Sequence, residues 1–407
     1  MTKREEFESR FKVLAQAPVA FATESETDAS SEQVQKLLKE TIERLESDPS
    51  LFSGDADGVF TYEDPVLALA AMYDRISPQV ISRVGFAGIQ GEQLRNASAL
   101  RWIRTAVQAL LARGDRSYVL LSGRTPQEPI KISGEKLRLA IVGDAGYEGY
   151  AQARVVRWMH ERHLEDPFDL VIHLGDIYFS GSEREIFVNF LAPFSLIGPR
   201  VLTLIGNHDL YYGAEGYSHA LDVLNQPGRY FSIETPHWII ACLDTALPAD
   251  SLRRNEGFLD QGQLKWLDTI FHSKGDKCII LMSHHYTVSA WETTSRELGL
   301  QLRDRLQERK VTAWYWGHEH GCATYERDSN GFYGACVGNG SFLEIWREPH
   351  LTPEPSWYAK GRCSCYSDKE SKFWPHGYLE LELKPKQIIE NYHLENGESH
   401  SRTVPIT

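Results

Sequence analysis

Residues 137–144 have the sequence LRLAIVGD, an apolar run that ends in glycine and aspartate. Residues 170–176, LVIHLGD, repeat this arrangement. Between the two runs, apolar residues stand at positions 151, 155, 159 and 164, which is helical spacing and predicts a helix over 148–164. A strand, a helix and a second strand in this order predict a βαβ unit with parallel strands, right-handed by strong precedent. The fold class that these residues indicate is α/β.

Strands and helices alternate along most of the remaining chain. A helix is expected to begin at Ser182, because Glu185 follows at the spacing of a capping box. Apolar periodicity predicts the later elements in order: strands at 201–205, 230–233 and 238–243, a helix from 260, a strand at 278–282, a helix at 296–309 and a strand at 311–316. Strand-like segments at 378–383 and 388–393 predict an antiparallel finish.

The first 130 residues differ from the rest. Helical spacing predicts amphipathic helices at 33–45 and 96–112, and a short strand is expected at 118–121. We therefore divide the chain into a mainly helical region of unknown role, residues 1–130, and a second domain, residues 131–400. Because an amphipathic helix must bury one face, the helical region is expected either to restrict access to a cleft or to form a homo-oligomer contact.

Composition excludes several classes of protein. With 407 residues, 42% apolar and 24% charged, the chain is typical of soluble globular proteins and not of collagen, coiled coils or disordered chains. A net charge of −13 makes nucleic acid a poor partner. The sequence indicates neither a secretion signal nor an uncharged run of the roughly 18 residues that a membrane span requires. Six thinly spread cysteines favour the reducing cytoplasm.

Residues of the types that bind metals follow five of the apolar runs. They are Gly143-Asp144, Gly175-Asp176, Gly206-Asn207-His208-Asp209, His284-His285 and Gly317-His318-Glu319-His320. Each group alone is weak, since a His-x-His pair arises by chance roughly 0.5 times in such a chain. The carboxyl ends of strands in an open α/β sheet converge on one edge, where ligand sites form. The ordered set at strand ends therefore predicts one shared metal site.

The five groups resemble the ordered motifs of the calcineurin-like metallophosphoesterases, over roughly residues 135–395. This resemblance implies a four-layer αββα sandwich that holds two metal ions and hydrolyses phosphate esters. It makes residues 131–400 a metallophosphoesterase domain, acting on a small phosphorylated substrate as a phosphomonoesterase or as a phosphodiesterase of small molecules or cyclic nucleotides. The alternatives are a nuclease, which needs a basic track, and a non-catalytic scaffold with the same fold, a class in which metal ligands are typically lost.

The resemblance also assigns the metal ligands ion by ion: Asp144 and His320 for the first ion, Asn207, His284 and His318 for the second, and Asp176 as the bridge. Two divalent ions about 3.5 to 4 Å apart need a bridging carboxylate, supply a hydroxide nucleophile at neutral pH and neutralise charge on the phosphate. His208 is expected at the leaving-group oxygen or at a phosphoryl oxygen, with Asp209 fixing its tautomer. His285 is expected behind the ligands or in packing, although it competes with His284 as the ligand.

One position departs from the family pattern. Most members have a histidine two residues after the first aspartate, where this chain has Gly146. The motif here is similar to that of purple acid phosphatases, in which a tyrosine three residues after the bridging aspartate binds ferric iron. That position is Phe179, and the tyrosine stands one residue earlier, at Tyr178. Tyr178 is expected either to bind the first ion or to form an aromatic wall of the cleft; iron, manganese and zinc remain open as the metal.

Overall fold

The computed structural model describes residues 120–406, apart from 127, 147–149, 179–180, 211–213, 248–256, 293, 295, 309–310, 328–330, 343, 345 and 361–372. The helices expected at 33–45 and 96–112 lie outside these residues. The strand expected at 118–121 is wrong where it can be compared, because Leu120 and Leu121 are helical. Leu121 is buried with Tyr217 and Leu221, and a short apolar run does not distinguish a buried helical turn from a strand.

Two β-sheets form the centre of the described chain. The six-stranded sheet has the order β14 (Ser399–Pro405), β13 (Gln387–Leu394), β12 (Gly377–Lys384), β2 (Leu137–Val142), β3 (Leu170–His173) and β4 (Arg200–Thr203). The eight-stranded sheet has the order β1 (Ile130–Lys131), β5 (Phe231–Glu234), β6 (Trp238–Cys242), β7 (Cys278–Ser283), β8 (Val311–Trp316), β10 (Tyr333–Val337), β9 (Cys322–Tyr325) and β11 (Trp357–Tyr358). The predicted β segments from residue 137 onward all fall on strands, and the last strand extends past residue 400.

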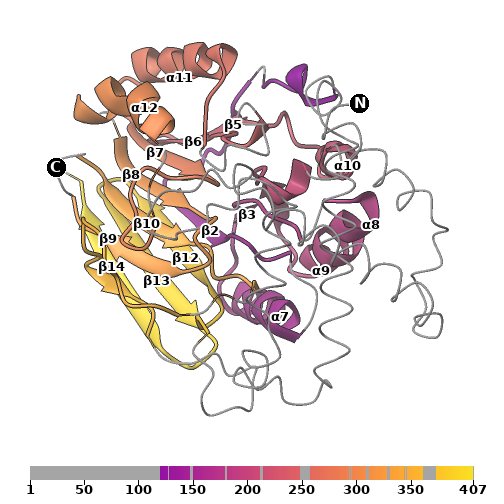
Figure 1. Cartoon of the computed structure of the whole chain (residues 1–407). Helices are drawn as coiled ribbons and strands as arrows, with labels where there is room; N and C mark the ends of the chain where they lie inside the picture. The colour runs from indigo at the N-terminus through magenta and orange to yellow at the C-terminus, as the bar shows by residue number, and fades with distance from the viewer. Residues whose placement is uncertain are drawn as a thin grey trace, which may run out of the picture. The chain divides into compact units, whose positions relative to one another are not determined.

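Helices cover the outer faces of both sheets (Figure 1). They are α7 (Tyr150–Glu165), α8 (Glu183–Glu185), a π-helix (Ile186–Leu191), α9 (Ala192–Ser195), α10 (Glu215–Val223), α11 (Gln261–Ser273) and α12 (Arg296–Gln307). β2 shows how the layers arise: Leu139 and Ile141 join the core that includes β6 and β7, whereas Ala140 and Val142 pack with α7 and the π-helix. The fold is therefore an αββα sandwich, as expected. Among the described helices, none combines the length and the apolarity that crossing a bilayer requires.

The strand directions bring the predicted motifs to one edge. β2, β3 and β4 are parallel neighbours, and so are β6, β7 and β8. The loops that follow them are joined by backbone hydrogen bonds, from Asp144 N–H to Gly175 O and from Gly317 N–H to His284 O. The predicted antiparallel finish is confirmed, because β12 pairs antiparallel with both β2 and β13.

The helix expected at Ser182 begins there. The Ser182 side chain accepts the Glu185 N–H, and the Glu185 carboxylate accepts the Ser182 N–H, which completes the capping box. After one α-helical turn, however, the chain continues as the π-helix over Ile186–Leu191. The sequence pattern did not predict this wider turn.

Candidate metal centre

Four of the six predicted ligands have left-handed backbone. Their φ angles are 56° at Asp144, 67° at Asp176, 67° at His318 and 52° at His320. Such a backbone costs about 1–3 kcal/mol per non-glycine residue and occurs mainly at functional sites. The strain thus coincides with the residues that the motifs single out.

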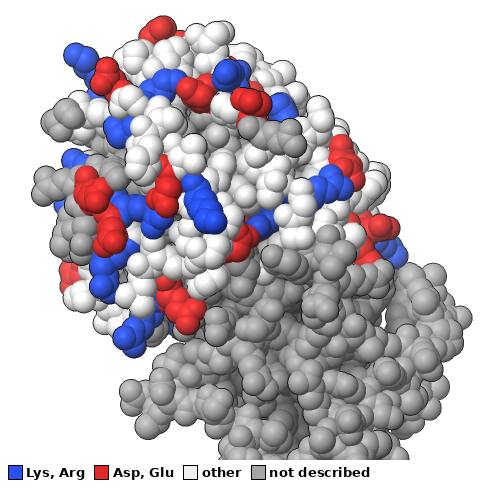
Figure 2. All heavy atoms as spheres, turned by 90° about the horizontal axis from the view of Figure 1, so that it is seen from above, with Lys and Arg blue, Asp and Glu red and all other residues white. Residues whose placement is uncertain are grey.

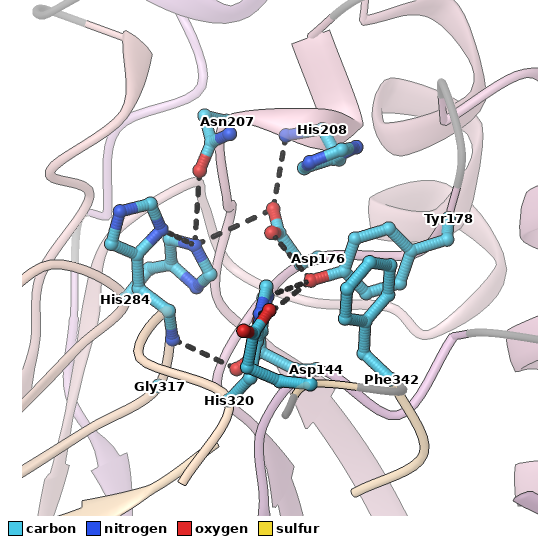
Figure 3. A network of polar contacts seen from close by, with 12 residues as sticks. Asp144, Asp176, Tyr178, Asn207, His208, His284, Gly317, His320 and Phe342 are labelled. Carbon is cyan, nitrogen blue, oxygen red and sulfur yellow. Dashed lines mark hydrogen bonds and ion pairs between the residues drawn. The ribbon is translucent and has the colours of Figure 1, made fainter. Parts of the chain in front are cut away.

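The first group of donors consists of Asp144, Asp176 and His320, whose ligand atoms lie within 4.8 Å of one another (Figure 3). The Tyr178 hydroxyl lies among them. Its oxygen is 2.9 Å from Asp144 Oδ1, 3.0 Å from Asp176 Oδ2 and 2.7 Å from His320 Nε2. The structure therefore places Tyr178 at the first donor group.

The second group of donors surrounds the His284 ring. His284 Nε2 lies 3.2 Å from Asn207 Oδ1 and 3.1 Å from His318 Nδ1. On the other side of the ring, Nδ1 lies 2.9 Å from the Leu174 carbonyl oxygen, which fixes the proton on Nδ1 and leaves the Nε2 lone pair for a metal. Two imidazole nitrogens and an amide oxygen that face one point are a fitting donor set for a borderline divalent ion.

Asp176 connects the two groups. Its Oδ2 faces the Tyr178 hydroxyl at the first group, whereas its Oδ1 lies 3.4 Å from His284 Nε2 at the second. The side chain is 1% exposed, and Oδ1 also accepts the His208 backbone N–H at 2.9 Å. One buried carboxylate is thus shared by two donor groups, so the residues present fit a pair of ions.

The neighbours of these donors favour positive charge. Burial lowers the pKa of His284, but the Asp176 carboxylate outweighs it and raises that pKa to about 9. Burial likewise opposes protonation of His320, whereas the Asp144 and Glu344 carboxylates raise its pKa to about 10. Burial and the neighbouring histidines hold the pKa of His318 well below its usual value, so its ring is neutral. The carboxylates therefore favour positive charge in the site.

His285 lies beside the second group. The ring is 3% exposed, and its Nδ1 lies 2.9 Å from Thr245 Oγ1. Ligand atoms of His284, His285 and His318 fall within 4.8 Å of one another, and His285 Nε2 has no hydrogen-bond partner among the residues that the structure describes. His285 is therefore buried against the ligands, and its assignment as ligand or support stays a prediction.

Asp209 holds the backbone of the two loops next to it. Its carboxylate accepts backbone N–H groups of Asp176 at 3.1 Å, Ile177 at 2.8 Å and Gly206 at 2.8 Å. Burial and the Asp176 carboxylate raise the pKa of Asp209 to about 7, although the N–H groups of Gly206 and Ile177 oppose this rise. Asp209 therefore ties the loop after β3 to the loop after β4, and its expected effect on the tautomer of His208 stays a prediction.

The His208 ring lies at the edge of the site. It is 8% exposed, and its centroid is 4.5 Å from that of Tyr178 (Figure 3). The His208 backbone N–H donates to Asp176, so the ring is anchored to the shared carboxylate through its own main chain. The position is compatible with a contact to the substrate next to both donor groups.

The structure explains why residue 146 is glycine. A Cβ atom at this position would lie 2.3 Å from Ile177 Cα, far inside van der Waals contact. No side chain fits, so the histidine that most of the family has there is sterically excluded. The Tyr178 hydroxyl instead provides a fourth polar atom at the first group. Phe179, the alternative tyrosine position, lies outside the described residues.

Two further side chains at the site did not emerge from the sequence. The Phe342 ring lies 4.4 Å from the Tyr178 ring and 4.3 Å from the His320 ring, and Glu344 Oε2 lies 3.7 Å from His320 Nδ1. Both follow β10 through the turn Gly338-Asn339-Gly340, which is another glycine-rich strand end. That turn was the available signal, but it is followed by Ser341 and Phe342 and not by an aspartate or a histidine.

Comparisons with known proteins agree with this geometry. The family model of the calcineurin-like phosphoesterases matches residues 137–322. The chain is 22% identical over 157 residues to the 3′,5′-cyclic adenosine monophosphate phosphodiesterase CpdA of Pseudomonas aeruginosa. That match covers 37% of this chain and 54% of the relative, so the chain spans about half the length of this curated relative.

Two solved structures were compared with the chain, and the likeness to one of them supports the fold. GAP50, described as the anchor in the inner membrane complex of Plasmodium, superposes with a TM-score of 0.52 at 14% identity and covers 67% of this chain and 89% of its own. A dimetal phosphatase from Danio rerio superposes with a TM-score of 0.47 at 13% identity and covers 69% of this chain and 100% of its own. At this level of identity, the likeness to GAP50 shows a shared fold.

Proposed function

We propose that the protein is a dinuclear metal-dependent hydrolase of phosphate esters, since residues 137–322 match the family model of the calcineurin-like phosphoesterases. The observation that carries the proposal is the carboxylate of Asp176, which is shared by two complete donor groups. A small phosphomonoester or a small phosphodiester is the proposed substrate. The similarity to a cyclic AMP phosphodiesterase supports the inclusion of cyclic nucleotides in this class.

In this proposal, Asp144, Asp176 and His320 hold the first ion, and Asp176, Asn207, His284 and His318 hold the second. When bound, such a pair lowers the pKa of water and neutralises the charge that develops on the phosphoryl group. The chain itself orients the ligands: Leu174 O fixes the tautomer of His284, and the backbone N–H of His318 donates to Asp144 Oδ2 at 2.8 Å. Rigid ligands avoid reorganisation during the reaction.

We assign His208 to the substrate. Its ring lies 4.5 Å from the Tyr178 ring, and its backbone N–H donates to Asp176, the residue that both donor groups share. From this position we assign it to donate a proton to the leaving-group oxygen or a hydrogen bond to a phosphoryl oxygen. Asp209 holds the loop that carries His208 through the Gly206 N–H. His208 is therefore the proposed catalytic side chain, and Asp209 a positioning residue.

We further assign Tyr178 as a ligand of the first ion. Its hydroxyl is within 3.0 Å of three donor atoms of that group, and Gly146 excludes the alternative histidine. A phenolate with two carboxylates is a hard donor set that favours ferric iron over zinc or manganese at this position. The second group, with two imidazoles, suits zinc, manganese or ferrous iron.

The alternatives are less well supported. A non-catalytic scaffold does not require six convergent ligands with strained backbone, yet this chain keeps them all. For a nuclease, a continuous basic track is needed. On the face shown in Figure 2, Lys and Arg are interspersed with Asp and Glu. The described cysteines Cys242, Cys278, Cys322 and Cys336 are free thiols, which is compatible with the cytoplasmic location that we propose.

A metal-reconstitution assay tests the function. The full chain is stripped with a chelator, reloaded with iron, manganese or zinc, and assayed with p-nitrophenyl phosphate, its bis-ester and a panel of cyclic nucleotides. We expect metal-dependent turnover that Asp176→Asn abolishes and that Asp222→Asn, a change to an exposed carboxylate paired with Arg124, leaves intact. Absence of metal-dependent turnover on every substrate would refute the proposal.

A further inference from the structure

We infer that Asn189, carried by the π-helix, is a positioning residue that fixes the Tyr178 phenol at the first donor group. The inference rests on the proposed function, because it concerns the ligand that we assign to the first ion. Three observations outside the sequence motifs support the inference. They are a hydrogen bond from Asn189 to the loop after β3, the π-helix that carries Asn189, and a buried side-chain amide of α7 that contacts Asn189.

The hydrogen bond is direct. Asn189 Nδ2 donates to the Tyr178 carbonyl oxygen at 2.9 Å, and the Asn189 side chain is buried, with 4% exposed. Burial of a carbonyl without a hydrogen-bond donor costs about 1–3 kcal/mol, so this hydrogen bond stabilises the observed position of the loop after β3. It is made across eleven residues, from the outer helical layer to the residue whose side chain reaches the donors.

The π-helix sets where Asn189 points. Its turn is wider than an α-helical turn, as the bond from the Ala192 N–H to the Phe187 carbonyl shows. One extra residue in a helix rotates all following residues by about 100° relative to an α-helix. In this turn, Phe187 is 59% exposed and Val188 is 51% exposed, whereas the Asn189 side chain faces the interior. Because Asn189 lies inside the π-helix, its side chain points in a different direction from the one that a regular α-helix would give it, although by less than for the residues that follow.

The backbone of Asn189 is held as well. Gln152 of α7, which is 5% exposed, donates from Nε2 to the Asn189 carbonyl oxygen. Two buried amides therefore act in series, Gln152 on Asn189 and Asn189 on Tyr178. In this way, the position of the loop after β3 is tied to α7 in the helical layer.

The hydrogen bond from Asn189 matters because two aromatic rings already pack against the phenol ring. The His208 ring lies 4.5 Å and the Phe342 ring 4.4 Å from the Tyr178 ring. With the ring confined, the distance of the hydroxyl from Asp144, Asp176 and His320 depends on where the backbone of Tyr178 is held. Mutation of a residue that supports a metal ligand in this manner typically lowers metal affinity by about 10–100-fold.

The test uses the full chain loaded with ferric iron at the first site. Visible absorption detects a tyrosinate–iron charge-transfer band. Titration of metal into protein that a chelator has stripped gives the affinity for the first ion. We expect Asn189→Leu to shift or weaken the band and to lower that affinity by about 10–100-fold. Asn189→Asp, which keeps the shape but removes the donor, is expected to act in the same direction and serves if the leucine variant does not fold.

The matched control is Gln226→Leu, which removes another buried amide that donates to backbone carbonyls, those of Thr203 and Gly228. It should leave both the band and the affinity for the first ion unchanged. If a folded Asn189 variant keeps the wild-type band and affinity, the inference is wrong. If wild-type protein shows no tyrosinate band, the Tyr178 assignment and this inference both fail, whereas metal-dependent turnover would still uphold the hydrolase proposal.

Discussion

Replacement of Gly146 by alanine tests why this chain departs from the family pattern. The new Cβ would lie 2.3 Å from Ile177 Cα and 2.9 Å from Ile177 Cβ, whereas carbon atoms in contact prefer about 3.5–4.0 Å. Relief requires a backbone displacement of roughly 1 Å, because the closest atom belongs to the main chain. Overpacking of this kind typically costs about 1–3 kcal/mol, and we expect about 3 kcal/mol here.

The displacement reaches the metal centre because Ile177 stands between Asp176 and Tyr178. A shift of about 1 Å at positioned groups can reduce activity by about 10²-fold, so affinity for the first ion should fall together with stability. Urea unfolding of metal-free protein measures the first effect and metal titration the second. Gly123→Ala is the control, since a Cβ there meets nothing within 4 Å, and its effect should stay within about 1 kcal/mol. A Gly146→Ala protein as stable and as metal-competent as wild type would refute the steric argument.

Three further predictions concern the same region. Gly206→Ala places a Cβ 2.1 Å from Asp176 Oδ1 and should weaken binding of both ions by at least about tenfold, as measured by metal titration, with circular dichroism confirming the fold. His208→Gln should lower kcat by about 10²–10⁴ without loss of metal, and by more for alkyl phosphates than for p-nitrophenyl phosphate, since the poorer leaving group depends more on a proton. An equal loss on both would assign His208 to a phosphoryl oxygen. Burial and the Glu292 carboxylate raise the pKa of Glu319 to about 8 in the folded protein. The contribution of Glu319 to the free energy of unfolding is therefore fully present below the unfolded pKa near 4.5 and is lost as the pH rises towards 8. In the metal-free wild type, the free energy of unfolding should fall by about 2–3 kcal/mol between pH 6 and 8 because of this group. Urea unfolding at several pH values should show that Glu319→Gln removes this part of the pH dependence. An unchanged pH dependence in the variant would contradict the prediction.

Much of the sandwich follows from local sequence. The runs at 137–142 and 170–173 combine strand length with buried composition, and the capping box at Ser182 marks a helix start that the structure confirms. The π-helix after Glu185 was not predicted, because one additional residue leaves a short apolar pattern almost unchanged. The strand expected at 118–121 failed for a related reason: the packing of Leu121 on α10 decides its conformation, and packing is not local.

The donor residues that the structure brings together were predictable because five strand ends carry distinctive residues in a fixed order. Contacts between residues that are far apart in the sequence could not be predicted in this way. Asp209 follows His208 directly, which suggested a bond between them, yet its oxygens accept N–H groups from the loop after β3. Phe342 and Asn189 reach Tyr178 from other elements, and neither has a local pattern that indicates such a contact. The left-handed backbone at Asp144 and His320 was also not predicted.

The central claim is that one buried carboxylate is shared by two ions. Anomalous diffraction from crystals of the iron- or manganese-loaded protein tests it most directly. We predict two peaks, one among Asp144, Tyr178 and His320 and the other among Asn207, His284 and His318, with Asp176 between them. A single peak, or peaks that do not contact Asp176, would contradict the account.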